Sequence, residues 1–314
     1  MRDLRIVFMG TPEFAVTILK KLVEDDFNIV GVVTAPDKKA GRGRKINESA
    51  IKKYAVKNKL KLLQPKNLKS EDFLSNLKAL RANLQIVVAF RMLPKVVWKM
   101  PTYGTFNLHA SLLPDYRGAA PIHWAIINGE EKTGVTTFFI DEKIDTGNII
   151  LQKEIIIHKD EIVGELHDRL MNLGANLVSE TVINIKNNSV TTQKQKNDSQ
   201  KTAPKLFPEN CKINWNNSID KIYDHIRGLN PFPGAWSDMM NNNVITSLKI
   251  YKIRKEEIIH KEVIKSIITT KNDIRIAVNG GYIIIDELKI SGKKKLDSKS
   301  LLNGYSFSIN AKMR

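Results

Sequence analysis

Three polar side chains carry the clearest chemistry in this sequence. Asn107 and His109 stand two residues apart at the end of an apolar, strand-like run (residues 105–108), so an extended backbone places them on the same face. An asparagine amide can donate a hydrogen bond to a developing oxyanion, and a histidine can move a proton near neutral pH. Asp145, in the turn-like sequence Asp-Thr-Gly, could orient the His109 imidazole. The trio indicates chemistry at a carbonyl carbon; a buried histidine satisfied by backbone and an aspartate that only shapes a turn are the alternatives.

A second candidate site is a basic segment with two glycines. Five of the eight positions from 38 to 45 are basic, and Gly41 and Gly43 let the backbone approach a partner closely. Such a loop suits contacts with phosphate groups, although an exposed charged loop without a partner explains the same pattern. Its basic residues are Lys38, Lys39, Arg42, Arg44 and Lys45.

The elements that must position these residues form an α/β pattern. Short apolar runs at residues 4–9, 27–33, 84–89, 105–108, 135–140 and 149–157 alternate with helix-like segments, which predicts a doubly wound, mostly parallel sheet. Thr11 and Pro12 predict the start of a helix, with Thr11 as its cap. Ligands of such sheets bind at the carboxyl ends of the strands, where Asn107 and His109 fall. No G-x-G-x-x-G motif follows the first strand, which disfavours an NAD or FAD enzyme.

The second half of the chain changes character. Apolar positions recur at helical spacing over residues 161–185, and a polar stretch without periodicity follows. We therefore predict an N-terminal catalytic domain over residues 1–188, a linker over 189–206 and a β-barrel domain over 207–314. From residue 208 onward there are 18 Lys and Arg against 11 Asp and Glu. A basic barrel is a common nucleic-acid platform, and a solvated lysine-rich barrel that binds nothing is the alternative.

Composition narrows the class of protein further. The 314 residues are 42% hydrophobic and 26% charged, as in a globular protein, and the net charge of +17 reflects a polyanionic partner or a codon bias toward lysine. A single cysteine, Cys211, excludes a disulfide framework and a cysteine-rich metal site, and we expect no metal. No apolar run approaches the roughly 20 residues of a membrane span. We expect a cytoplasmic, bacterial protein that is a monomer and binds no membrane.

Taken together, the motifs resemble those of the methionyl-tRNA formyltransferases over essentially the whole chain. The resemblance rests on FMGTPEF (residues 8–14), PDKKAGRGR (36–44), Ser-Leu-Leu-Pro (111–114) with RGAAPI after it, and RGLNPFPGAW (227–236), besides the Asn, His and Asp trio. It implies transfer of the formyl group of 10-formyltetrahydrofolate to the α-amino group of methionyl initiator tRNA. It also implies a Rossmann-like formyltransferase domain followed by an open barrel of the oligonucleotide-binding (OB) type.

The resemblance further assigns roles to individual residues. Asn107, His109 and Asp145 match the catalytic trio of the family, and the basic loop matches the segment that engages the tRNA acceptor end. The segment that contacts the folate matches Ser111, Leu112, Leu113 and Pro114. The sequence VAFRMLP (88–94) departs from the pattern, since many members carry a glycine and one more residue there. That segment borders the folate pocket in the family, so we expect a different pocket outline near Arg91.

Other acceptors remain as alternatives. Formyltransferases that act on a sugar-nucleotide amine or on glycinamide ribonucleotide use a similar Asn, His and Asp site. The basic loop and the strong positive charge argue against both. A non-catalytic RNA-binding protein on a decayed enzyme scaffold predicts broken site residues, whereas all three are present here.

Overall fold

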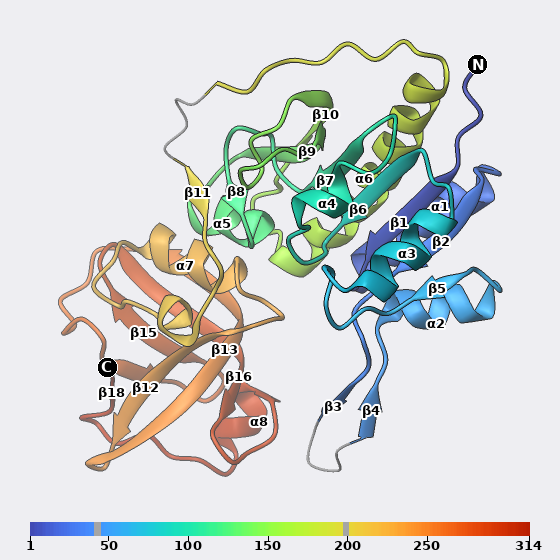
Figure 1. Ribbon diagram of the computed structural model, residues 1–314. Helices are drawn as coiled ribbons and strands as arrows, with labels where there is room; N and C mark the ends of the chain where they lie inside the picture. Colours follow the sequence, from blue (N-terminus) through green and yellow to red (C-terminus); the bar gives the residue numbers. More distant parts are fainter. Residues whose placement is uncertain (41–44, 197–200) are drawn as a thin grey trace. The chain divides into compact units, whose positions relative to one another are not determined.

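The computed structural model describes residues 1–40, 45–196 and 201–314 (Figure 1). Arg42 and Arg44, two residues of the predicted basic loop, lie outside the described residues. The chain forms two compact units that interleave along the sequence. The first comprises Met1–Gly118, Gly134–Ile155 and Asp168–Thr202, and the second comprises Ala119–Thr133, Ile156–His167 and Ala203–Arg314.

A seven-stranded sheet forms the centre of the first unit. Its strands are β1 (Ile6–Gly10), β2 (Ile29–Val33), β5 (Leu62–Leu63), β6 (Leu84–Val88), β7 (Thr105–His109), β9 (Lys132–Phe139) and β10 (Ile149–Ile156). They lie in the order β10-β9-β7-β6-β1-β2-β5. The pairs from β7 to β5 are parallel, while β9 runs antiparallel to β7. The carboxyl ends of β1, β6 and β7 therefore meet at one edge of the sheet.

Helices cover both faces of this sheet, as Figure 1 shows. On one face, α3 (Glu71–Ala79) and α4 (Lys95–Trp98) pack their apolar side chains against those of β1 and β6 in one buried cluster. On the other, the Cβ position of Gly174 in α6 (Val163–Lys186) lies 2.8 Å from Leu108 of β7. Burial on both faces explains why β1 is apolar throughout, and why β6 is apolar except for Gln85, rather than alternating.

The remaining elements around this sheet are short. They are α1 (Glu13–Glu24), β3 (Lys38–Ala40), β4 (Lys45–Asn47), α2 (Ala50–Lys57), β8 (Arg117–Gly118) and β11 (Thr202–Ala203). The predicted cap of α1 is wrong: Pro12 occupies the N-cap position and no side chain caps this helix. Strands β3 and β4 pair antiparallel on either side of the basic loop.

An antiparallel sheet builds the second unit. Its strands are β12 (Ala235–Asn241), β13 (Val244–Glu257), β14 (Ile267–Thr269), β15 (Ile274–Val278), β16 (Gly281–Ile290), β17 (Leu296–Asp297) and β18 (Lys312–Met313). Their order is β14-β15-β16-β13-β12-β18, with β17 paired to β16. Backbone hydrogen bonds from Ile267 to Ala311 (3.0 Å) and from Met313 to Lys265 (2.9 Å) join the two ends of the sheet. The strands therefore form a nearly closed barrel, which confirms the predicted fold class.

Short helices pack against this barrel. They are α5 (Pro121–Ile127), a 3-10 turn (Pro208–Cys211), α7 (Ile219–Arg227) and α8 (Ser298–Leu302). In α7 the apolar residues Ile219, Ile222, Tyr223 and Ile226 recur at helical spacing and are buried with the strand residues in one core. Burial raises the pKa of the Cys211 thiol, which lies in the same core. No helix within the described ranges is both long enough and apolar enough to cross a membrane.

A buried hydrogen bond in the barrel core depends on a single side-chain oxygen, the hydroxyl of Ser237. Trp215 is 1% exposed, and its indole N–H donates a 2.8 Å hydrogen bond to the hydroxyl of Ser237, itself fully buried on β12. We predict that Ser237→Ala lowers the free energy of unfolding by about 1–3 kcal/mol, because it leaves the indole N–H unpaired in the core. Urea denaturation measures this change. Ser291→Ala, at an exposed serine of the same barrel, should have no effect; equal losses for both variants would refute the role of the contact.

Candidate active site

Strand β7 places two of the predicted residues on the same face. Leu108 contacts α6, so the alternation of the strand directs Asn107 and His109 to the opposite face. The hydroxyl of Thr105 confirms this direction, since it donates to the carbonyl of Trp98 in α4 at 2.8 Å. His109 is buried, and the Asn107 side chain is half-buried at the carboxyl end of the strand.

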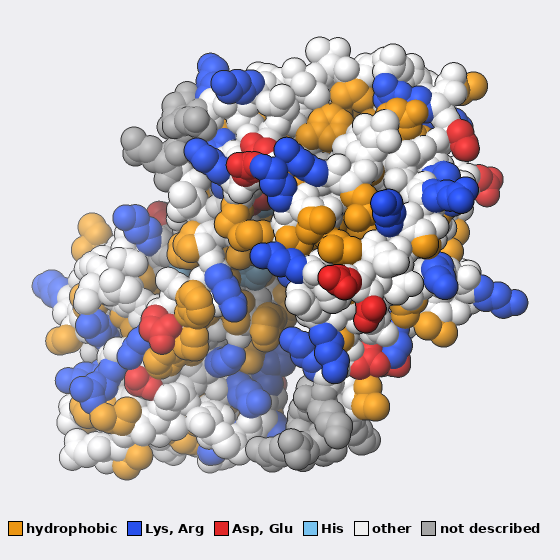
Figure 2. Space-filling model, viewed as in Figure 1, with side chains coloured by type: hydrophobic (Ala, Val, Ile, Leu, Met, Phe, Trp, Pro, Cys, Tyr) orange, Lys and Arg blue, Asp and Glu red, His pale blue; other side chains and the backbone are white. Residues whose placement is uncertain are grey.

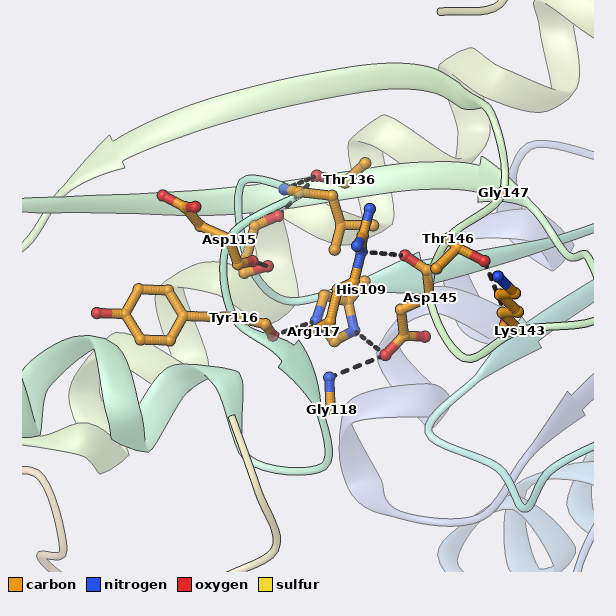
Figure 3. A network of polar contacts seen from close by, with 12 residues as sticks. His109, Asp115, Tyr116, Arg117, Gly118, Thr136, Lys143, Asp145, Thr146 and Gly147 are labelled. Carbon is orange, nitrogen blue, oxygen red and sulfur yellow. Dashed lines mark hydrogen bonds and ion pairs between the residues drawn. The ribbon is translucent and has the colours of Figure 1, made fainter. Parts of the chain in front are cut away.

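The imidazole of His109 is held from both of its nitrogens (Figure 3). Nε2 lies 2.8 Å from the carbonyl oxygen of Tyr116, and since a carbonyl only accepts, Nε2 is the donor in this contact. Nδ1 faces the carboxylate of Asp145, with 3.8 Å between Nδ1 and Oδ2. The structure thus brings two of the three predicted residues together, and it leaves Nδ1 as the nitrogen able to exchange a proton with a bound molecule.

The Asp145 carboxylate is oriented by its surroundings. Its Oδ2 atom accepts a 3.0 Å hydrogen bond from the backbone N–H of Gly118. Asp145 itself has a φ of 55°, in the left-handed region that residues with a Cβ seldom occupy. Two residues later, a Cβ built on Gly147 would lie 1.7 Å from the carbonyl oxygen of Phe139, so only glycine allows the loop to pass so close to β9. Composition predicted a turn here, and the structure adds that the turn aims the carboxylate at His109.

Two residues that sequence reasoning missed hold this loop from behind. Arg117 Nε donates to the Asp145 carbonyl at 3.0 Å and to Gln195 Oε1 at 3.1 Å. Gln195 Nε2 donates to the carbonyls of Asp145 (3.0 Å) and Gly147 (2.7 Å). Arg117 is the first residue of the RGAAPI motif, although no role was predicted for it. Gln195 stands in the polar stretch taken for a linker, where no periodicity marks it.

The amide of Asn107 has hydrogen-bonding capacity left for a ligand. Among the described residues, none donates a hydrogen bond to its buried Oδ1 atom. A buried amide oxygen without a partner is costly, so a bound molecule or water gains by filling this position. The unpaired oxygen therefore suits a ligand that donates a hydrogen bond, such as an amine, better than a purely structural role.

The segment from Ser111 to Pro114 is firmly packed behind His109. The Ser111 hydroxyl is fully buried and donates to the Asp115 carbonyl at 2.6 Å, and Leu113 belongs to a small core cluster. Leu112 contacts Gly134, where a Cβ would lie 2.5 Å from its side chain. Thr136 of β9 bonds to the backbone of Ser111 (2.6 Å) and of Leu113 (3.2 Å). These contacts fix the backbone that follows β7.

A groove of about 610 Å³ lies beside the segment that departs from the family pattern. Apolar and basic side chains line it together: Lys66, Asn67, Leu68, Lys69, Arg91, Met92, Leu93, Pro94, Lys95 and Val96. The guanidinium of Arg91 donates to the carbonyls of Pro65 and Lys66, and partial desolvation lowers the pKa of this side chain. Because residues 89–94 follow β6, the neighbour of β7, the groove opens at the sheet edge that carries Asn107 and His109.

Four of the residues that line the groove are basic, and basic side chains also occur outside it. On the face drawn in Figure 2, blue Lys and Arg side chains are scattered over the surface, with fewer red acidic side chains between them. Lys38 of β3 is exposed, and strands β3 and β4 carry the flanks of the basic loop. In the described part of the chain, no group of three or more His, Cys, Asp or Glu side chains could hold a metal ion.

An amide, an imidazole and a carboxylate at the carboxyl edge of an α/β sheet are the groups that chemistry at a carbonyl carbon requires. Two family models agree with this class: formyl transferase matches residues 4–182, and formyl transferase, C-terminal domain, matches residues 205–306. The chain therefore belongs to the formyl transferase family.

Curated relatives match the chain from end to end. A methionyl-tRNA formyltransferase of Flavobacterium johnsoniae is 57% identical over 314 residues, which cover 100% of both chains. One of Bacteroides fragilis is 49% identical and covers 99% of this chain and 98% of its own. Among solved structures, WlaRD, a sugar 3N-formyl transferase crystallised with dTDP and 5-N-formyl-THF, has a TM-score of 0.66 at 22% identity. It covers 94% of this chain and 100% of its own, and at that identity it supports the fold alone.

The close approach at Gly147 gives a test of the loop that carries Asp145. We predict that Gly147→Ala lowers kcat for formyl transfer by about ten- to a hundredfold, because the loop must shift and small displacements of reacting groups are costly. Steady-state assays measure it. Gly304→Ala is the matched control, since nothing lies within 4 Å of a Cβ at that position. A Gly147→Ala enzyme with the kcat of the control would show that the tight approach does not position Asp145.

Proposed function

We propose that the chain transfers the formyl group of 10-formyltetrahydrofolate to the α-amino group of methionyl initiator tRNA, giving N-formylmethionyl-tRNA for translation initiation. The observation that carries this proposal is the meeting of His109 Nδ1 and the Asp145 carboxylate beside Asn107, in a chain 57% identical over its full length to a methionyl-tRNA formyltransferase.

The reaction begins with attack by the free α-amine of the methionyl ester on the formyl carbon. A C–N bond forms, and the formyl oxygen becomes an oxyanion. The Asn107 amide and a proton on His109 Nδ1 are the donors that stabilise this charge. Because Nε2 is engaged with the Tyr116 carbonyl, the ring presents Nδ1 in a fixed direction. A donor held in place before the reaction costs little reorganisation when the charge develops.

Proton transfer completes the exchange. The Asp145 carboxylate accepts the proton that the attacking amine loses, directly or through water. His109 Nδ1 delivers a proton to N10 of the folate, which leaves as the N10–C bond breaks. A proton passing from Asp145 to His109 then restores both groups, so the cycle neither gains nor loses protons. This route uses no covalent enzyme intermediate.

The proposed folate site runs along the sheet edge from His109 to the groove beside Arg91. The backbone of Ser111, Leu112, Leu113 and Pro114 forms one wall, and the packing behind it keeps that wall rigid. The apolar residues of the groove suit a ring system, and its basic rim suits the carboxylates of the folate tail. Arg91 itself lines the groove and is partly desolvated, which supports an anionic ligand there.

The proposed tRNA contacts use the positive charge of both units. We propose that Lys38, Lys39, Arg42, Arg44 and Lys45 engage the acceptor end, and that the barrel binds further backbone phosphates. The net charge of +17 and the basic balance of residues 208–314 support a polyanionic acceptor. A sugar-nucleotide amine, the alternative acceptor, carries too few phosphates to need so large a positive field.

Removing single site residues should separate chemistry from binding. We predict that Asn107→Ala, His109→Ala and Asp145→Asn each lower kcat by about 10²–10³, as the loss of one oxyanion donor typically does. KM for the tRNA should change by less than about threefold, since these side chains act in the transition state. Steady-state kinetics measure both constants. His158→Ala, at an exposed histidine, is the control; near-normal kcat for His109→Ala would sink the mechanism.

A comparison of acceptors tests the proposed substrate. We predict that formyl transfer from 10-formyltetrahydrofolate, at one fixed salt concentration, is fastest with methionyl initiator tRNA. Methionyl elongator tRNA and an amino-sugar nucleotide serve as competing acceptors, and initial rates at equal concentration measure the preference. Transfer to the amino sugar alone would keep the chemistry of the site and overturn the acceptor.

A further inference from the structure

We infer that Gln195 is a positioning residue for the Asp145 carboxylate, so that the polar segment after α6 is part of the active site rather than only a connection. This inference rests on the catalytic role proposed above for Asp145. It concerns one side-chain amide, and that amide is almost completely buried, with 6% of the residue exposed.

The side-chain amide of Gln195 uses its full hydrogen-bonding capacity. Its Nε2 atom donates both hydrogens to the Asp145 loop, to the carbonyls of Asp145 (3.0 Å) and Gly147 (2.7 Å). Its Oε1 atom accepts twice from Arg117, from Nε at 3.1 Å and from the terminal nitrogen at 2.6 Å. Only a glutamine or asparagine amide offers two donors and a double acceptor, and the reach required here favours the longer side chain.

The pairing of the backbone at Gln193 with Ile149 determines where the Gln195 side chain lies. Gln193 and Ile149 exchange two backbone hydrogen bonds, of 2.8 and 2.9 Å, in an antiparallel bridge. Moving two residues along each strand of such a pair brings position 195 opposite position 147. The bridge at the start of β10 therefore delivers the Gln195 side chain to the end of the Asp145 loop. The location of the amide is set by strand pairing and not by an accidental surface contact.

Without these hydrogen bonds the backbone of the loop would not stay in its present conformation. Asp145 occupies the left-handed region, where a residue with a Cβ stays only if its surroundings hold it. Its carbonyl oxygen is fixed by two donors, Arg117 Nε and Gln195 Nε2. On the other side of the same residue, the carboxylate is fixed by the Gly118 N–H and faces His109. Turning the peptide plane at Asp145 would also turn the carboxylate away from Nδ1.

Two substitutions at this position separate the bonds. Gln195→Leu keeps the shape and removes all four. Gln195→Glu keeps the acceptor for Arg117 and removes both donors to the loop. It therefore tests the hydrogen bonds to the Asp145 loop alone, and it replaces the leucine variant if that variant fails to fold. Gln193→Leu is the matched control, a glutamine two positions earlier whose side chain is exposed while its backbone makes the bridge.

We expect both Gln195 variants to lower kcat by about ten- to a hundredfold, as a displaced reacting group does. KM for methionyl tRNA and for the folate should stay within about twofold, because binding surfaces are untouched. The Gln193→Leu enzyme should match the parent in kcat, KM and melting temperature. Parental kcat in the Gln195→Glu enzyme, or a rise in both KM values in place of a fall in kcat, would overturn the inference.

The double variant Gln195→Glu with Asp145→Asn tests whether Gln195 acts through Asp145. If Gln195 acts through Asp145, its substitution costs less than about twofold further once the carboxylate is gone, since contacting residues are not additive. A full additional loss would show that Gln195 acts elsewhere and overturn the inference. A parental kcat for Asp145→Asn alone would remove the proposed role of Asp145 itself. An impaired Asp145→Asn beside unimpaired Gln195 variants would remove only the positioning role.

Discussion

Two hydrogen bonds to the carbonyl oxygen of Asp145 hold the conformation on which the rest of the site depends. They come from Arg117 and Gln195, and they keep the residue in a left-handed conformation that aims its carboxylate at His109. The same carboxylate would point elsewhere on a relaxed turn, because side-chain direction follows φ and ψ. The geometry of this site thus depends on two side chains that donate to one backbone carbonyl.

The sheet and the loops divide the work of building this site. Strand β7 lies inside the sheet, between β6 and β9. Asn107 and His109 are therefore attached to a rigid, buried backbone. The carboxylate, by contrast, sits on a loop, where the left-handed backbone it needs is tolerated. Strand pairing fixes His109, while side-chain hydrogen bonds fix Asp145. A distance of 3.8 Å between them leaves room for a proton to move without locking the pair in one direct hydrogen bond.

How far the sequence predicts this structure depends on which interactions carry each element. Strands such as β6 and β16 contain a buried run of three apolar residues (86–88 and 283–285), and such a run reveals a strand in the sequence. Strand β12 was missed, because two of its inward positions are the polar Ser237 and Asn241, satisfied by partners distant in sequence. The trio was predicted from residue types and motifs. Gln195 was not, because its value lies in contacts with residues 48 to 78 positions away, which no local pattern encodes.

The separation of charge from chemistry explains how one fold can serve different acceptors. In the proposed mechanism, Asn107, His109 and Asp145 act on the formyl group and an attacking amine, and neither step depends on what carries the amine. The net charge of +17, distributed along the chain, is the feature that we propose attracts a polyanionic carrier. That attraction weakens steeply with salt, whereas hydrogen bonds inside a buried site do not. In the function that we propose, acceptor selection lies in the basic loop and the barrel, outside the groups assigned to the transfer, so changes there are expected to alter recognition while the reacting geometry is kept.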